Sequence, residues 1–130
     1  MQLREKDLCV RDLTDLAQRT MDVLEPHRVP LLINDRLDVA MAIGAQGIHL
    51  PGTGLSPVDA RRLFKGLIGI STHSVEQVSA ADPGIVNFCT FGPVFDTPSK
   101  RAYGPPQGVL RLQAAIATAR IPVFAIGGIS

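Results

Sequence analysis

Aromatic residues, charge imbalance and long apolar runs are all scarce in this 130-residue sequence. It has no Trp, one Tyr and five Phe, so it offers few side chains on which single-stranded bases could stack. Thirteen Lys and Arg against twelve Asp and Glu give a net charge of +1, which provides no positive field for nucleic acid or anionic lipid. No apolar run reaches the roughly 18 residues of a membrane-spanning helix. We therefore expect no nucleic-acid partner and no membrane span.

Cysteine is scarce too. Cys9 and Cys89 are too few for a disulfide framework, so two free thiols in a reducing compartment are the simpler interpretation. The first nine residues, MQLREKDLC, are too charged for a signal peptide, and we expect a cytoplasmic location. Hydrophobic residues make up 45% of the chain and charged residues 19%, a balance that allows one domain with a buried core.

Short apolar runs recur along the chain and predict strands, because continuous runs are typical of strands covered on both faces of a parallel sheet. The runs are Val29–Ile33, Gly47–Leu50, Leu67–Ser71, Ile85–Phe91 and Ile121–Ile126, with Gln2–Arg4 as the tail of another strand. Segments with helical periodicity or capping residues lie between them. These predict helices over Val10–Leu24, Arg36–Gly44, Ser56–Lys65, Ser74–Ala81 and Val109–Arg120.

This alternation of strands and helices predicts a parallel sheet with right-handed crossovers. Two architectures fit it: a doubly wound open sheet and a (β/α)8 TIM barrel, which needs about 200 residues or more. Six strands and five helices fall short of a whole barrel. On the barrel interpretation we expect an incomplete fragment of a longer protein, with unpaired first and last strands. Composition alone does not choose between the two.

Small, polar and charged residues follow the predicted strands at their carboxyl ends, where the working residues of parallel α/β folds lie. Arg and Lys there supply charge-assisted hydrogen bonds to phosphate, and Asn34 with Asp35 supplies oxygen ligands suited to Mg²⁺. Gly127 and Gly128 permit close approach of backbone N–H groups to phosphate oxygens. The pattern predicts a site for phosphorylated substrates. Its other members are Arg4, Lys6, Ser71, His73, Thr97, Ser99 and Lys100.

Each of these residues also has an ordinary structural interpretation. The alternatives are a solvated strand end for Arg4 and Lys6, a helix cap for Asn34 and Asp35, a structural histidine for His73, a turn for Gly127 and Gly128, and a plain loop for 97–100. The recurrence of such groups at several strand ends favours a site, since loops without a function need not place them there.

Six segments of the chain, in this order, are similar to segments of one protein family. They are QLREK (2–6), INDR (33–36), GIHL (47–50), STHS (71–74), FGPVF with TPSK (91–100) and AIGGI (125–129). The sequence resembles the thiamine phosphate synthase/TenI superfamily, whose fold is a (β/α)8 barrel. The resemblance implies one partial domain over residues 1–130, from the second barrel strand to the seventh.

The resemblance also implies a reaction on small phosphorylated substrates. Thiamine phosphate synthases join hydroxymethylpyrimidine diphosphate to thiazole phosphate, as diphosphate leaves and the thiazole nitrogen attacks the pyrimidinyl-methyl cation. Mg²⁺ and cationic side chains stabilise the departing polyanion. By this resemblance Gln2, Arg4, Lys6 and Asn34 contact the pyrimidine diphosphate, Asp35 binds Mg²⁺, Ser71 and Lys100 hold the diphosphate, and Thr97 and Ser99 bind the thiazole phosphate with the backbone around Gly127 and Gly128. Lys100, Ser71 and His73 are then the catalytic candidates.

One loop departs from the synthase pattern. Synthases carry a second Mg²⁺ carboxylate in a run similar to HLGQxD, whereas this chain reads HLPGTG from His49 to Gly54, and Asp59 comes later. We expect the loss of one carboxylate to weaken Mg²⁺ binding. The loop is more similar to that of TenI proteins, which tautomerise the thiazole carboxylate phosphate. His73 would transfer the proton there, but it fits both patterns. A tautomerase and a non-catalytic phosphate-binding barrel therefore remain alternatives, and the oligomeric state, including a homo-oligomer, stays open.

Overall fold

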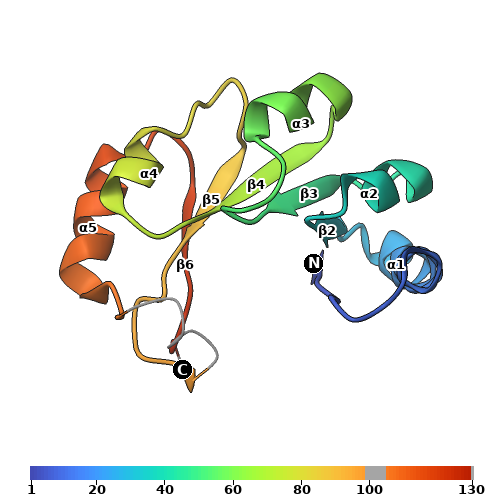
Figure 1. The fold of residues 1–130 in the computed structure, drawn as a ribbon, viewed down its shortest axis with the longest axis horizontal. Helices are drawn as coiled ribbons and strands as arrows, with labels where there is room; N and C mark the ends of the chain where they lie inside the picture. Colours follow the sequence, from blue (N-terminus) through green and yellow to red (C-terminus); the bar gives the residue numbers. More distant parts are fainter. Residues whose placement is uncertain (99–104, 130) are drawn as a thin grey trace. The chain divides into compact units, whose positions relative to one another are not determined.

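The computed structural model describes residues 1–98 and 105–129 and divides into two compact units, Met1–Gly69 and Ile70–Ser130. Its strands form one six-stranded sheet in chain order (Figure 1). They are β1 (Gln2–Leu3), β2 (Leu32–Asn34), β3 (Gly47–Leu50), β4 (Leu67–Thr72), β5 (Phe88–Phe91) and β6 (Val123–Ala125). The helices are α1 (Val10–Leu24), η1 (Glu25–His27), α2 (Leu37–Ile43), α3 (Pro57–Leu63), α4 (Val75–Ser79) and α5 (Gly108–Thr118).

The order of the strands decides between the two expected architectures. A doubly wound sheet reverses its strand order near the centre, whereas here each strand neighbours the next one in the sequence. Parallel pairing with defined register joins β1 to β2, β2 to β3 and β5 to β6. This sequential order is the one that a (β/α)8 barrel requires.

Each predicted strand and helix is confirmed, and most are shorter than predicted. The first three residues of the predicted strand Ile85–Phe91 are not part of the strand. The amides of Ile85 and Val86 donate instead to the carbonyl of Asp82, at 2.9 and 2.8 Å, and form a turn. The strand therefore begins at Phe88. Buried apolar residues alone cannot separate such a turn from a strand.

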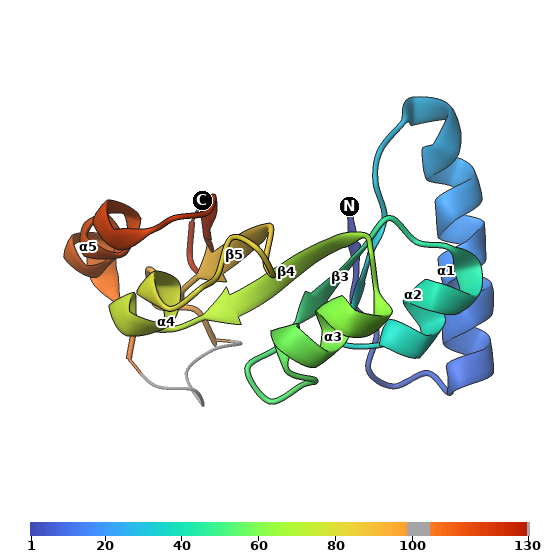
Figure 2. The ribbon, with the colours of Figure 1, turned by 90° about the horizontal axis from the view of Figure 1, so that it is seen from above.

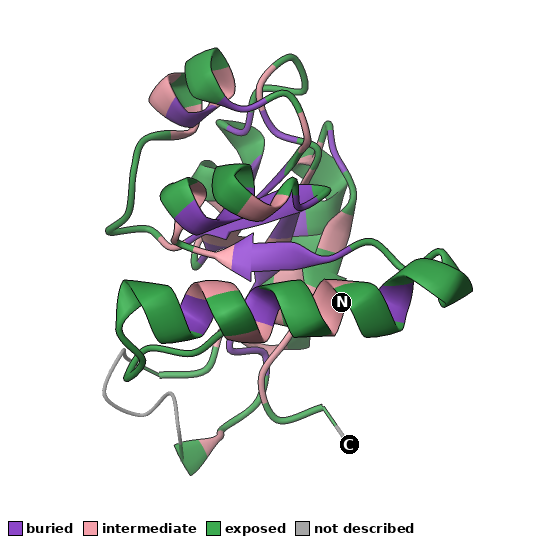
Figure 3. Cartoon of the chain, turned by 90° about the vertical axis from the view of Figure 1, so that its right-hand side faces the viewer, coloured by how far each residue is buried: buried purple, intermediate pink, exposed green. Residues whose placement is uncertain are grey.

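In the first unit, α1 and α2 pack side by side (Figure 2). The long helix α1 is mostly exposed or half-buried (Figure 3), and its buried residues, Leu13, Ala17 and Leu24, lie at helical spacing. All four residues of β3 are buried, as expected for a strand with no polar face. One of them is a histidine, His49, which is only 4% exposed.

In the second unit, α4 and α5 pack together against β5 and β6. The side chains of Cys89 and Phe91 on β5 join Val78 of α4 and Ala115 of α5 in one buried cluster. The predicted cap of α4 is confirmed, because Ser74 Oγ accepts the Gln77 amide at 3.3 Å. Cys9 is exposed and Cys89 is buried, and both are free thiols as expected.

Across the described ranges, 1–98 and 105–129, no helix is long and apolar enough to cross a membrane.

The burial of β3 predicts the effect of a truncation. Leu50 is 1% exposed, so Leu50→Ala leaves a cavity and lowers the free energy of unfolding by about 2–5 kcal/mol. Leu63→Ala is the control, because Leu63 lies in the same unit and is 60% exposed; it changes the free energy by less than about 0.5 kcal/mol. Urea denaturation measures both, and equal losses would contradict the assigned core.

The burial of His49 predicts a pH dependence. Burial disfavours the charged imidazolium and lowers the pKa of His49 below its ordinary value. The unfolded chain then binds more protons than the folded one, so stability is complete above about pH 6.5 and falls as the pH drops below it. His49→Gln should flatten this slope, whereas His27→Gln, at an exposed position, should not. Urea midpoints from pH 5 to 8 test this, and an unchanged slope in His49→Gln contradicts it.

Candidate functional site

In the first unit, the side chain of Gln2, the first residue of β1, reaches that of Asn34, the last residue of β2. The Nε2 of Gln2 donates to Oδ1 of Asn34 at 3.2 Å. The register pairs Asn34 with His49 of β3, so these two side chains lie on the same face of the sheet. Two residues predicted from the sequence are therefore brought together, and a third polar residue lies beside them.

Sequence reasoning did not choose His49 as a site residue. It is a lone polar residue in an otherwise apolar run, and its burial lowers the pKa of the imidazole. Burial therefore favours the neutral form of the His49 imidazole. The signal that could have found it is its place in GIHL, one position before the end of a predicted strand.

Asp35 follows β2 directly, and we call Asn34 and Asp35 together the β2 corner. Asp35 has a φ of +64°, a left-handed conformation that is uncommon outside glycine. Its N–H donates to the carbonyl of His49 at 2.9 Å, and its own carbonyl accepts the Leu37 amide at 3.2 Å. The side chain is exposed, so the strained backbone presents a carboxylate to solvent.

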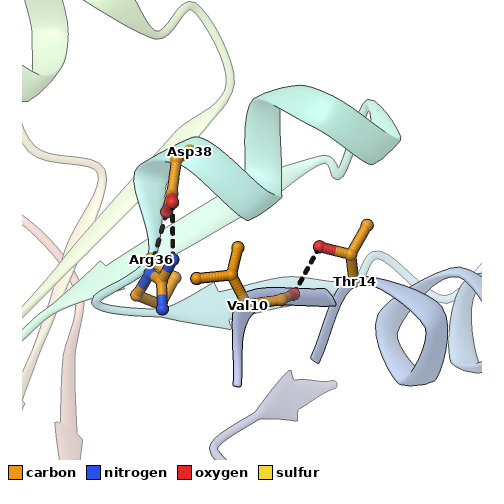
Figure 4. A network of polar contacts seen from close by, with 4 residues as sticks. All are labelled: Val10, Thr14, Arg36 and Asp38. Carbon is orange, nitrogen blue, oxygen red and sulfur yellow. Dashed lines mark hydrogen bonds and ion pairs between the residues drawn. The ribbon is translucent and has the colours of Figure 1, made fainter. Parts of the chain in front are cut away.

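The β2 corner is not a helix cap. Helix α2 begins at Leu37, its N-cap is Arg36, and no side-chain hydrogen bond caps it. This excludes the ordinary interpretation of Asn34 and Asp35. Arg36 itself is engaged, because its Nε and Nη2 donate to the two carboxylate oxygens of Asp38 at 2.9 and 2.5 Å (Figure 4). This pairing raises the pKa of Arg36 and lowers the pKa of Asp38.

Arg4 and Lys6 lie just beyond β1, and both are exposed. Glu5, between them, accepts the Asp7 amide at 3.1 Å through its Oε1. Positive charge therefore follows Gln2 at the same strand end as the amide pair. A solvated strand end and a phosphate contact both remain compatible with this exposure.

The turn after β3 brings no second carboxylate to Asp35. Gly54 donates its N–H to the Pro51 carbonyl at 3.0 Å and lies close to the Asp35 side chain. Asp59 is engaged elsewhere: Ser56 Oγ donates to one of its oxygens at 2.7 Å and Arg62 Nη1 to the other at 3.0 Å. Within the described part of the chain, no three His, Cys, Asp or Glu residues are grouped to hold a metal ion.

A single carboxylate is still compatible with one mode of Mg²⁺ binding. Mg²⁺ in proteins keeps several waters and often uses one or two carboxylates together with substrate phosphates. Asp35 is exposed and its carboxylate is not shared with an ion pair among the described residues. The β2 corner therefore suits a metal ion that arrives with phosphate oxygens, not one held by the protein alone.

In the second unit, two predicted residues lie at the end of β4. Ser71 is half-buried and His73 is exposed. The Nδ1 of His73 lies 2.5 Å from the carbonyl oxygen of Gly92, and its backbone N–H donates to Gln77 Oε1 at 2.6 Å. Because a carbonyl oxygen only accepts, a hydrogen bond at this contact places a proton on Nδ1. His73 is therefore oriented by its neighbours, as both a structural and a proton-transferring histidine would be.

Gly127 and Gly128 pack against the segment that follows β5. Both have positive φ, +92° and +67°. A Cβ on Gly127 would lie 2.6 Å from Pro93 Cα, and one on Gly128 would lie 2.8 Å from Phe95 Cβ. The amides of Val94 and Phe95 donate to the carbonyls of Ile126 and Gly127 at 2.9 Å each. The glycine pair is thus required by backbone conformation and by packing, whatever it binds.

Of the remaining candidates, Thr97 is half-buried near this segment. Ser99 and Lys100 lie outside the described residues. The structure therefore brings Gln2, Asn34 and Asp35 together in one unit, and holds Gly127 and Gly128 against residues 93–96 in the other. That all the candidates meet at one mouth stays a prediction.

A cavity in the first unit lies away from these residues. It is lined by residues of α1 and η1 and by Pro30 and Gln46, which precede β2 and β3. None of the predicted site residues lines it. It lies beside the amino ends of β2 and β3, whereas the active sites of parallel barrels lie at the carboxyl ends of the strands, so we do not assign the site to it.

Comparison with known proteins agrees with the fold. The TMP-TENI family model, described as thiamine monophosphate synthase, matches residues 1–130. A thiamine-phosphate synthase of Albidiferax ferrireducens is 41% identical over 131 residues, covering 99% of this chain and 60% of that protein. One from Thermus thermophilus is 39% identical over 130 residues, covering 99% and 63%.

A solved structure gives the same result. The thiamine phosphate pyrophosphorylase from Pyrococcus furiosus matches with a TM-score of 0.90 and 26% sequence identity, over 99% of this chain and 62% of that one. The chain thus spans less than two thirds of the length of these relatives. The (β/α)8 fold class expected from the sequence is confirmed. Since the family model extends from the first residue to the last, the chain belongs to the thiamine monophosphate synthase family.

Proposed function

We propose that this chain is part of a thiamine phosphate synthase, a transferase of thiamine biosynthesis. The reaction couples hydroxymethylpyrimidine diphosphate to thiazole phosphate and releases diphosphate. The observation that carries the proposal is the β2 corner, where the exposed Asp35, with its left-handed backbone, directly follows the Asn34 whose side chain accepts a hydrogen bond from Gln2. Relatives whose sequences are 36–41% identical to this chain carry the name thiamine-phosphate synthase.

The chemistry needs stabilisation of a departing polyanion, and the exposed cations after β1 suit this need. Arg4 and Lys6 donate charge-assisted hydrogen bonds to the diphosphate, and Gln2 and Asn34 contact the pyrimidine diphosphate. Asp35 would hold Mg²⁺, which when bound neutralises the charge that develops on the leaving diphosphate.

The residues of the second unit take the remaining roles in this proposal. Ser71 and Lys100 hold the diphosphate. Thr97 and Ser99 bind the thiazole phosphate, with backbone N–H groups around Gly127 and Gly128. His73 is the proton-transfer candidate, and the contact of its Nδ1 with the Gly92 carbonyl, which orients the ring, supports this role.

Two further proposals concern the partners of the protein and its location in the cell. The partners are small phosphorylated molecules, since the exposed cations, hydroxyls and glycines suit phosphate and not an extended polyanion. The location is cytoplasmic, since both cysteines are free thiols.

The direct test supplies both precursors and Mg²⁺ to the purified protein. Formation of thiamine phosphate, followed by chromatography with fluorescence detection, is the expected result. Isomerisation of a thiazole carboxylate phosphate without thiamine phosphate would replace the synthase with a tautomerase. Thermal stabilisation by the phosphorylated precursors without turnover would leave a non-catalytic phosphate-binding barrel.

The role of the cations can be tested by substitution. Arg4→Ala removes a charge from the diphosphate site, and we expect kcat/KM for the diphosphate substrate to fall at least about tenfold, or about 1.4 kcal/mol of transition-state stabilisation. The double change Arg4→Ala with Lys100→Ala should abolish turnover. Arg19→Ala, on the exposed side of α1, is the control and should leave kcat/KM unchanged. Wild-type kinetics in the double variant would refute the assigned site.

A further inference from the structure

The peptide group that joins Thr72 to His73, at the end of β4, is held from both sides. Its carbonyl oxygen, that of Thr72, accepts the Gly92 amide at 3.3 Å. Its N–H, that of His73, donates to the side-chain Oε1 of Gln77 at 2.6 Å. The Thr72 side chain is buried, and its Oγ1 donates to the Thr90 carbonyl at 2.9 Å. These contacts fix the orientation of the peptide and the direction in which His73 leaves the strand.

Gln77 also belongs to the cap of α4, but the cap does not account for its contact with His73. Ser74 is the N-cap residue, and its Oγ accepts the Gln77 amide at 3.3 Å. In a capping box, the side chain of the third helical residue, here Gln77, returns to the backbone N–H of the N-cap residue. The Gln77 oxygen instead reaches one residue further back, to the amide of His73. The contact therefore fixes the segment that precedes the helix.

The ring of His73 is anchored at the same place. Its Nδ1 lies 2.5 Å from the carbonyl oxygen of Gly92, the residue whose amide donates to Thr72. Gly92 is itself closely packed, because a Cβ at this position would collide with the Ile126 carbonyl oxygen. The ring can reach Gly92 only while the backbone of His73 points its side chain there, and the Thr72–His73 peptide sets that direction. Gln77 therefore acts on the ring through the backbone.

We propose that Gln77 is a positioning residue for His73. Its Oε1 fixes the Thr72–His73 peptide, and this peptide directs the imidazole onto the Gly92 carbonyl with a proton on Nδ1. The effect on turnover rests on the proposed function, in which His73 transfers a proton, whereas the effect on the ring does not. All of these residues belong to the second unit.

The ring is tested first, by long-range ¹H–¹⁵N correlation spectra of the purified protein, which show the nitrogen that carries the proton. Spectra are recorded at about pH 8.5, where imidazole side chains are ordinarily neutral. The chain has three histidines, so the signals of His73 are assigned by their loss in His73→Gln. We expect the proton on Nδ1, and slow hydrogen exchange of the His73 amide although the residue is exposed.

Gln77→Met removes the accepting oxygen and keeps the length and helix propensity of the side chain. In this variant we expect loss of the Nδ1 signal and at least about tenfold faster exchange of the His73 amide. Gln77→Glu keeps an accepting oxygen, in the first turn of a helix where a carboxylate is favourable, and should restore both readouts. Gln113→Met is the matched control, because it makes the same change at an exposed position of α5 in the same unit. It should leave both readouts unchanged.

Ser74→Ala separates positioning from capping. It removes the N-cap hydroxyl and should lower the thermal midpoint, but it leaves the acceptor of the His73 amide in place. The ring should therefore keep its proton on Nδ1. Equal changes of the ring signals in Ser74→Ala and Gln77→Met would assign Gln77 to capping alone and overturn the proposal.

Turnover provides the second readout. With both precursors and Mg²⁺ supplied, we expect Gln77→Met to lower kcat about tenfold and to leave KM within twofold, because a misplaced proton-transferring group affects the transition state more than substrate binding. Gln77→Glu should recover kcat. Loss of the Nδ1 signal without loss of kcat overturns the part of the proposal that concerns turnover.

The proposal is also overturned if the neutral ring of the unchanged protein carries its proton on Nε2, or if Gln77→Met keeps the Nδ1 signal. The first result needs no variant, so it applies even where Gln77→Met does not fold. These outcomes are separate from the activity. If thiamine phosphate does not form but the ring signals follow the expected pattern, the proposed function fails and the role of Gln77 stands. The reverse pattern removes Gln77 alone.

Discussion

The hydrogen bond from the Asp35 amide to the His49 carbonyl, 2.9 Å long, holds the end of β2 against β3. It continues the strand pairing one residue beyond Asn34 and fixes Asp35 in its left-handed conformation. A shift of one residue in this register would turn the side chains of β2 to the opposite face. The amide pair and the carboxylate would then no longer share the carboxyl end of the strands.

Much of the fold could be predicted from the sequence because local and long-range requirements agree. The run Gly47–Leu50 is a strand over the predicted residues, since all four are buried. Gly44 ends α2 with a φ of +69°, and Ser56 caps α3 by accepting the Asp59 amide at 3.1 Å. These are local signals that a single segment carries by itself. Strand order is not local, and only the structure excluded the doubly wound sheet.

The site was predicted less completely, and for a physical reason. Residues such as Asn34 and Asp35 could be chosen because they follow a predicted strand, and parallel strands end at one edge. The contacts that give them meaning join segments far apart in the sequence. Gln2 reaches Asn34 across 32 positions, and Gly54 lies against Asp35. No pattern within one segment reports either contact, or the burial of His49.

A crystal structure with Mn²⁺ and inorganic diphosphate tests the central claim most directly, since the anomalous scattering of manganese locates the ion. We expect the ion about 2.1 Å from a carboxylate oxygen of Asp35, with diphosphate oxygens completing its coordination and Arg4 or Lys6 against the diphosphate. Manganese and diphosphate bound elsewhere, for example in the cavity beside α1 at the amino ends of β2 and β3, would contradict the assignment of the β2 corner as the functional site.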